Sequence, residues 1–289
     1  MHALTEFHGL PCIDLSLPAG DRVRIALHGA HVLSWTTADG TERLYLSPKA
    51  HLDGRNPIRG GVPLCFPQFN QRELGGVSLP KHGFARTQAW TLAEGDVDTA
   101  SAAQVRLVLT STPETRALWP HEFEASLTVR LEPASLRFIF EVANTGTDAF
   151  EFALALHTYL RTGDVAQTTL DGLGGLGFWD AVEHLQQPHV RKVQPAAPLG
   201  FDGETDRVYA GVTQPLVMSQ PGSRLEITQS ASLPDAVVWN PGPVRCATLD
   251  DMPADGWRYM ACVEAARINQ PVSLLPGTSW TGWQGLRLA

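Results

Sequence analysis

Two runs of alternating residues, 125–131 and 136–142, constrain the fold of this 289-residue chain more than any other feature. In each run every second side chain is apolar, which is the pattern of a β-strand with one buried face. Residues 132–135 between them are few enough for a tight turn, so the two runs predict a β-hairpin. A third run, 152–160, follows the turn residues 144–148, and three successive antiparallel strands predict a meander.

The rest of the chain has the same character, with short strand-like segments and little helical pattern. The 26 glycines and 21 prolines also favour turns over long helices. Apolar residues make up 43% of the sequence, which is enough for a large core. Because no linker or internal repeat divides it, the chain predicts a single domain over residues 1–289. We expect an all-β fold, a large antiparallel β-sandwich.

The charge and the chain ends restrict the class of protein. A net charge of −8 predicts a surface that repels nucleic acid and anionic membranes. No apolar run approaches the roughly 20 residues of a membrane span, and the N-terminal residues lack a signal-peptide pattern. The cysteines are far apart and predict free buried thiols in a reducing compartment: Cys12, Cys65, Cys246 and Cys262. We therefore expect a cytoplasmic protein, and a monomer because no apolar edge or helix indicates an interface.

Residues 58–86 gather cations and a histidine among glycines, prolines and aromatic residues. Arg59 and Arg86 lie near its two ends, and a guanidinium suits bidentate contacts with phosphate or carboxylate. His82 could hydrogen-bond a polyhydroxylated ligand, or it could stabilise a turn. Since glycine lets a backbone approach a ligand closely, this 58–86 segment predicts a cradle for an anion.

Two residues outside that segment have the chemistry of proton transfer. His157 lies on the face of the 152–160 run that carries small side chains, where it could act as an acid or a base. It could also be an ordinary histidine with satisfied hydrogen bonds. Glu264 ends an apolar run, where burial would raise the pKa of its carboxyl toward the range of a general base. An ion pair with an arginine is the alternative.

Asp206 precedes a predicted strand and could accept hydrogen bonds from sugar hydroxyls, or it could be a turn residue or a partner of Arg207. We expect no metal site and no cofactor. The ten histidines form no HxH or HExxH pattern, and no nucleotide-binding glycine loop or GxSxG motif is present. With these motifs excluded, the remaining candidate groups are histidine, carboxylate and arginine side chains. They indicate proton transfer on an anionic small molecule.

Short motifs spread over nearly the whole chain resemble those of the glucose-6-phosphate 1-epimerases, a branch of the aldose 1-epimerase family. They are RGGVP at 59–63, FP at 66–67, HGFAR at 82–86, LHTY at 156–159, DRVY at 206–209, VWNP at 238–241 and CVEAA at 262–266. Each motif alone has little specificity, but the ordered set is specific. The resemblance implies the galactose-mutarotase-like β-sandwich, in agreement with the strand pattern.

The resemblance also implies the reaction and the roles of its residues. Glu264 would take the proton of the anomeric hydroxyl while His157 protonates the ring oxygen of a hexose 6-phosphate, with glucose 6-phosphate as the expected substrate. The ring would open to the aldehyde, rotate about C1–C2 and close as the other anomer. No cofactor is implied, because both groups only move protons.

The same resemblance implies the substrate-binding residues. Arg59 and Arg86 would bind the 6-phosphate, and Lys81 could add a third positive charge to that site. His82 and Asp206 would position sugar hydroxyls. Two other interpretations remain open: a sugar-phosphate sensor without catalysis, and a mutarotase for neutral aldoses in which the two arginines are structural.

Overall fold

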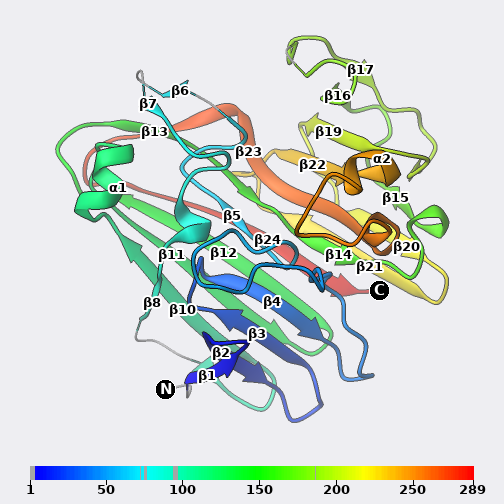
Figure 1. Ribbon diagram of the computed structural model, residues 1–289, viewed down its shortest axis with the longest axis horizontal. Helices are drawn as coiled ribbons and strands as arrows, with labels where there is room; N and C mark the ends of the chain where they lie inside the picture. Colours follow the sequence, from blue (N-terminus) through cyan, green and yellow to red (C-terminus); the bar gives the residue numbers. More distant parts are fainter. Residues whose placement is uncertain (1–3, 72, 75–76, 94–96, 186) are drawn as a thin grey trace.

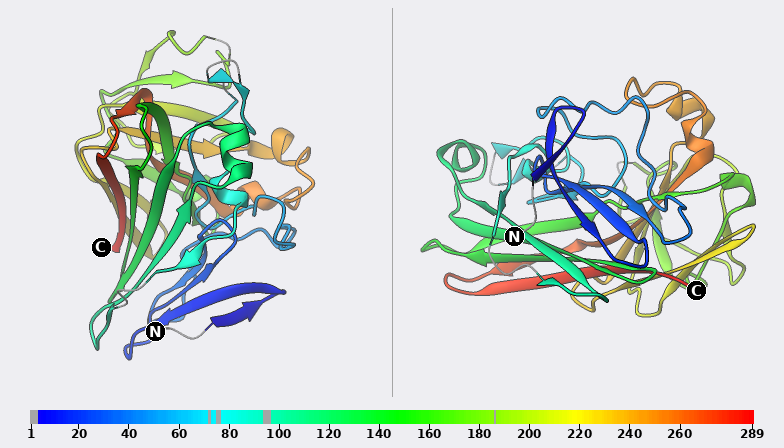
Figure 2. Two further views of the ribbon diagram at one scale, coloured as in Figure 1. Left: turned by 90° about the vertical axis from the view of Figure 1, so that its left-hand side faces the viewer. Right: turned by 90° about the horizontal axis from the view of Figure 1, so that it is seen from below.

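The computed structural model describes residues 4–71, 73–74, 77–93, 97–185 and 187–289. Two large antiparallel sheets, one of ten strands and one of eight, form a β-sandwich (Figure 1). In the turned views of Figure 2, the long green and red strands of the ten-stranded sheet form one layer, and the blue N-terminal strands lie beside it. The predicted fold class is therefore confirmed.

The ten-stranded sheet has the order β18-β15-β20-β21-β24-β12-β11-β10-β8, and β9 also pairs with β10. Its strands are β8 (Thr91–Leu92), β9 (Val97–Asp98), β10 (Ala103–Thr110), β11 (Phe123–Glu132), β12 (Ser135–Asn144), β15 (Thr169–Asp171), β18 (Leu199–Gly200), β20 (Leu216–Gln220), β21 (Ser223–Gln229) and β24 (Ser279–Leu288). The predicted hairpin is confirmed as β11 and β12, whose register pairs Glu132 with Ser135.

The eight-stranded sheet has the order β17-β16-β19-β22-β23-β13-β5, and β14 also pairs with β23. Its strands are β5 (Leu64–Cys65), β13 (Phe150–Leu156), β14 (Tyr159–Arg161), β16 (Gly177–Asp180), β17 (Lys192–Val193), β19 (Thr205–Ala210), β22 (Asp235–Asn240) and β23 (Met260–Leu274). This sheet matters most for function, because Asp206 lies on β19, Glu264 lies on β23, and His157 directly follows β13.

Smaller elements complete the chain. One further sheet has four strands, β1 (Leu4–Phe7), β2 (Leu10–Ser16), β3 (Arg22–Ala26) and β4 (His31–Thr36), and another pairs β6 (Glu73–Leu74) with β7 (Val77–Ser78). The helices are α1 (Pro113–Leu118) and α2 (Gly242–Cys246), with 3₁₀ turns η1 (Ala85–Thr87), η2 (Val165–Gln167) and η3 (Gly256–Tyr259). Among the described residues, no helix has the length and apolar character needed to cross a membrane.

The predicted meander is wrong. β13 does not pair with β12; it lies in the other sheet between β23 and β5, and β24 takes the place beside β12. Asn144, at the end of β12, stabilises the turn that leads from one sheet to the other. Its Nδ2 donates hydrogen bonds of 2.9 Å to the carbonyls of both Asp148 and Leu274, which tie the turn to the end of β23. A short turn therefore joins two sheets instead of two neighbours in one sheet.

The 58–86 segment is anchored in the core by Phe66. The Phe66 side chain is fully buried, and its ring centroid lies 5.3–6.4 Å from those of Phe84, Trp119, Phe123, Phe140 and Phe152. Gly83 has a φ of +71°, and a Cβ there would lie 2.1 Å from the carbonyl oxygen of Phe66. This glycine therefore permits backbone-on-backbone packing, and not the approach to a ligand that the sequence suggested.

Candidate active site

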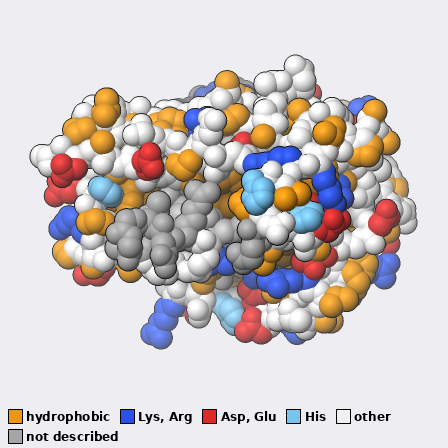
Figure 3. Space-filling model, turned by 90° about the horizontal axis from the view of Figure 1, so that it is seen from above, with side chains coloured by type: hydrophobic (Ala, Val, Ile, Leu, Met, Phe, Trp, Pro, Cys, Tyr) orange, Lys and Arg blue, Asp and Glu red, His pale blue; other side chains and the backbone are white. Residues whose placement is uncertain are grey.

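A cavity of about 900 Å³ lies over the eight-stranded sheet. Six of the seven predicted site residues line it: Arg59, Lys81, His82, His157, Asp206 and Glu264. The face seen from above in Figure 3 shows basic, acidic and histidine side chains mixed with apolar ones. Residues from chain positions 59 to 264 thus converge on one space that is large enough for a sugar phosphate.

His157 follows β13 directly, in a two-residue break before β14. The predicted strand over 152–160 is therefore interrupted at the histidine, because the Thr158 amide turns back to donate to the Leu156 carbonyl at 2.8 Å. The predicted position of His157, on the same face as Ala153 and Ala155, is nonetheless confirmed. Ala153 and Ala155 lie in a small cluster with cavity-lining residues, separate from the large core that holds Leu156.

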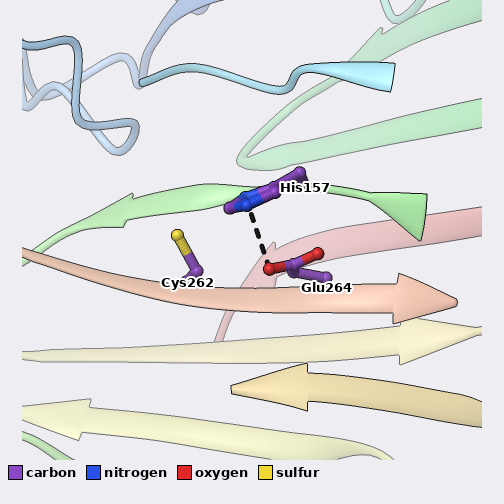
Figure 4. A group of neighbouring side chains, drawn as sticks. All are labelled: His157, Cys262 and Glu264. Atoms are coloured by element: carbon purple, nitrogen blue, oxygen red, sulfur yellow. Dashed lines mark ion pairs between the residues drawn. The ribbon is translucent and has the colours of Figure 1, made fainter. Parts of the chain in front are cut away.

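Glu264 projects from β23 toward His157, and Figure 4 shows the two side chains facing each other. The His157 Nδ1 lies 3.3 Å from the Glu264 Oε1. Glu264 is only 1% exposed, and neither of its carboxylate oxygens has a hydrogen-bond partner within the described part of the chain. The alternative of an ion pair with an arginine is thus not what these residues show.

Burial shifts the two titrations in opposite directions. Burial, with a smaller contribution from the negative charge of Asp206, raises the pKa of Glu264 well above its usual value. Burial, reinforced by the positive charges of Arg59 and Arg86, lowers the pKa of His157 well below its usual value. Burial thus favours the neutral form of both groups, a protonated Glu264 carboxyl beside an unprotonated His157 imidazole. Acid–base catalysis by this pair starts from the form in which the proton has moved from Glu264 to His157.

Aromatic side chains fix the orientation of the imidazole. The Tyr159 ring stacks on His157 at 4.8 Å with an interplanar angle of 10°, and Trp239 meets it edge-on at 6.1 Å. Arg59 is held beside them. Its Nε donates to the two carboxylate oxygens of Asp251 at 3.0 and 3.1 Å, and its Nη1 donates to the Tyr159 hydroxyl at 3.0 Å. One edge of this guanidinium is thus already occupied by a carboxylate.

Arg86 is the predicted site residue that does not line the cavity. Its Nη2 donates to the carbonyl of Lys81 at 2.8 Å, and its buried Nε has no hydrogen-bond partner among the described residues. Its positive charge still contributes to lowering the pKa of His82 and of His157. In this conformation Arg86 acts on the site through its charge and through the backbone of Lys81.

His82 and Asp206 are placed to contact a sugar. The Asn70 amide donates to the His82 Nδ1 at 3.2 Å, which assigns the proton of the neutral ring to Nε2 and makes that nitrogen a donor. Burial first, and then the charge of His157, lowers the pKa of His82 well below its usual value and favours this neutral form. Burial raises the pKa of Asp206 to about 6. The Arg207 Nε lies 3.6 Å from the Asp180 Oδ2, and among the described residues no ion pair joins Arg207 to Asp206.

Sequence patterns missed several residues of the cavity wall, among them Arg191, Arg245 and Asn269. Arg245 lies only four positions after the VWNP motif, at 238–241, and that short spacing is the signal that could have indicated it. The others come from loops or from a long strand whose pattern says nothing about a cavity.

A set of metal-type ligand atoms also lies in the site. The ligand atoms of His157, Cys262 and Glu264 lie within 4.8 Å of one another (Figure 4). Nitrogen, sulfur and oxygen together form a zinc-type set. Sequence spacing missed it because β23 supplies Cys262 and Glu264, whereas His157 comes from the distant break after β13. The positive charges of Arg59 and Lys81 oppose a divalent cation beside this group, so the electrostatics favour an anionic ligand. All four cysteines are free and buried, as predicted.

Solved structures share this architecture. A crystal structure from Salmonella typhimurium, described as a "putative mutarotase", has a TM-score of 0.89 at 28% identity, covering 100% of this chain and 93% of that one. A galactose mutarotase-like protein from Clostridium acetobutylicum has a TM-score of 0.77 at 17% identity, covering 100% and 98% of the two chains. The second likeness concerns the fold alone.

Two curated relatives carry the name "Putative glucose-6-phosphate 1-epimerase". The one from Cenchrus ciliaris is 33% identical over 266 residues, covering 89% of this chain and 78% of the relative. The one from Escherichia coli K12 is 35% identical over 246 residues, covering 85% and 79%. The sequence model of the aldose 1-epimerases matches residues 11–287. This chain therefore belongs to the aldose 1-epimerase family.

Proposed function

We propose that this protein interconverts the α and β anomers of a hexose 6-phosphate, with glucose 6-phosphate as substrate. The observation that carries the proposal is the buried His157–Glu264 pair, 3.3 Å apart, in a cavity that also presents Arg59 and Lys81. Membership of the aldose 1-epimerase family supports the reaction, and the names of the two curated relatives support the phosphorylated substrate.

The proposed reaction moves two protons. The Glu264 carboxylate takes the proton of the anomeric hydroxyl, and the His157 imidazolium gives its proton to the ring oxygen as the C1–O5 bond breaks. The aldehyde rotates about C1–C2, and the reverse transfers close the ring as the other anomer. The pair holds one proton before ring opening and one proton after it, so neither acid nor base is consumed.

Substrate charge assists the acid. The positive charge of Arg59 contributes to the lowered pKa of His157. A phosphate dianion near Arg59 and Lys81 would offset these charges and favour the imidazolium that the reaction needs. A neutral aldose would provide no such compensation, which gives a physical reason for preferring the phosphorylated sugar.

We propose the binding roles from the same positions. Arg59 and Lys81 bind the phosphate, while the His82 Nε2 donates to a sugar hydroxyl and the Asp206 carboxylate accepts from one. Arg86 would join the phosphate only if its Nη2 leaves the carbonyl of Lys81.

Saturation-transfer NMR tests the function. We expect the purified protein to accelerate α/β exchange of glucose 6-phosphate, and to do so at lower substrate concentration than for glucose. Tight binding of glucose 6-phosphate without acceleration would contradict the enzyme and support a sensor. Equal acceleration of both sugars at equal concentration would support a mutarotase for neutral aldoses.

The pH dependence of substrate binding tests the role of Asp206. Its pKa of about 6 means that the carboxylate is lost as the pH falls through that value. We therefore expect KM for glucose 6-phosphate to rise below about pH 6. The substrate phosphate also titrates near 6, so the comparison is with Asp206→Asn, which shares the substrate titration but lacks the carboxyl. A KM profile of the same steepness in the variant and in the natural protein would contradict this role.

A further inference from the structure

Arg245 is a cation of the cavity wall to which neither the sequence nor the family match gives a role. It lies in the last turn of the short helix α2, which follows β22, and it lines the cavity together with Lys81 and Asp206. Its side chain is exposed. Within the described part of the chain, its guanidinium makes no hydrogen bond or ion pair.

The other arginines near the cavity have partners that limit what they can donate. The Nε of Arg59 binds Asp251, and the Nη2 of Arg191 donates to the Asn269 Oδ1 at 2.6 Å. Arg86, which does not line the cavity, donates to the Lys81 carbonyl. Among the described lysines and arginines that line the cavity, Lys81 and Arg245 are the two whose charged groups make no hydrogen bond or ion pair. Their donors are therefore available to a ligand.

Lys81 and Arg245 also act on each other. Both residues line the same cavity, and after desolvation the positive charge of Arg245 is the largest cause that lowers the pKa of Lys81. The Asp206 carboxylate offsets them in part, because it raises the pKa of Lys81. One carboxylate cannot neutralise two cations, and a dianion between Lys81 and Arg245 would remove their repulsion.

We propose that Arg245 is a specificity residue that binds the phosphate dianion of a phosphorylated aldose together with Lys81. The guanidinium offers a planar pair of donors, and the ammonium acts as a compact point charge on the other side. The phosphate site would then lie on the α2 side of the cavity, away from the bond between Arg86 and the Lys81 carbonyl. This inference rests on the proposed function, because it names the part of the substrate that Arg245 recognises.

Arg245→Gln is the test variant, compared by kcat/KM for glucose 6-phosphate and for glucose. We expect the preference for glucose 6-phosphate over glucose to fall about 10-fold or more, mainly through KM, as for the loss of a charge-assisted hydrogen bond. Arg245→Lys should restore part of the preference. Arg55→Gln is the matched control, because Arg55 is an exposed arginine outside the cavity and its loss changes the net charge equally.

A preference in Arg245→Gln equal to that of Arg55→Gln would overturn the inference. An equal loss of turnover on both sugars would also overturn it, since that result indicates a structural role. Calorimetric titration with inorganic phosphate gives a readout independent of turnover, and weaker binding by Arg245→Gln than by Arg55→Gln is expected. If the natural protein binds phosphate through Arg245 but accelerates no anomer exchange, the proposed function fails while the recognition of phosphate stands.

Discussion

Replacing Glu264 with glutamine is expected to slow catalysed anomer exchange by roughly 10²–10⁴-fold, the usual contribution of a general base. The amide has nearly the same shape as the carboxyl, but it cannot accept a proton from the anomeric hydroxyl. His157→Asn should have an effect of similar size, because the ring oxygen then lacks its proton donor. Saturation-transfer NMR on the purified variants measures both effects.

The same Glu264→Gln variant should have a higher free energy of unfolding than the natural protein at neutral and alkaline pH. Burial raises the pKa of Glu264 in the folded state, so the folded protein binds this proton more tightly than the unfolded chain does. The stability associated with that proton is present at low pH and is lost as the pH rises through the folded-state pKa. Glutamine cannot ionise, so the variant lacks this loss. Urea unfolding at several pH values measures the difference.

A matched control is available on the neighbouring strand. Glu151 is an exposed carboxylate of β13 outside the cavity, and Glu151→Gln should leave anomer exchange unchanged. Natural rates of exchange in both Glu264→Gln and His157→Asn would contradict the assignment of this pair as base and acid. If the free energy of unfolding changes with pH in the same way in Glu264→Gln and in Glu151→Gln, ionising the buried Glu264 carboxyl does not destabilise the folded protein as expected.

The second large effect is expected from Phe66→Ala, which should lower the free energy of unfolding by about 3–5 kcal/mol. The Phe66 ring is fully buried among five aromatic rings, and removing it leaves a cavity in the centre of the core. Anomer exchange should also weaken, because the same segment carries Arg59, Lys81 and His82 into the site. Urea and thermal unfolding measure the stability.

Phe7→Ala provides the comparison for that variant, since Phe7 lies on β1 and is only partly buried. Its removal should cost much less than that of Phe66. Phe66→Leu should recover part of the loss, because leucine fills some of the vacated volume. A cost for Phe66→Ala no larger than that for Phe7→Ala would show that the 58–86 segment is not anchored as described.

Local patterns in the sequence were sufficient for the features that depend on local chemistry. The alternation of residues 125–142 predicted the β11–β12 hairpin, because a tight turn and two one-sided strands have few other arrangements. The small side chains beside His157 correctly indicated its face. The carboxyl at the end of an apolar run correctly indicated that Glu264 is buried.

Features set by contacts between distant parts of the chain could not be predicted in this way. β13 lies in the eight-stranded sheet because it pairs with β23, and residues 150–156 contain no sign of that distant partner. Arg86 has the residue type expected for phosphate binding, yet its direction is set by the carbonyl of Lys81. Arg245 lies four positions after the VWNP motif, but this spacing does not show that its side chain reaches the cavity, which depends on where the fold places α2.

The position of β24 has a consequence for synthesis of the chain. β24 is the last strand along the described sequence, yet it pairs with both β12 and β21 inside the ten-stranded sheet. While the chain is being made on the ribosome, one edge of β12 and one edge of β21 therefore stay unpaired until residues 279–288 emerge. Unpaired edges of this kind can recruit strands from other nascent chains, so this interval is when the protein is most exposed to aggregation.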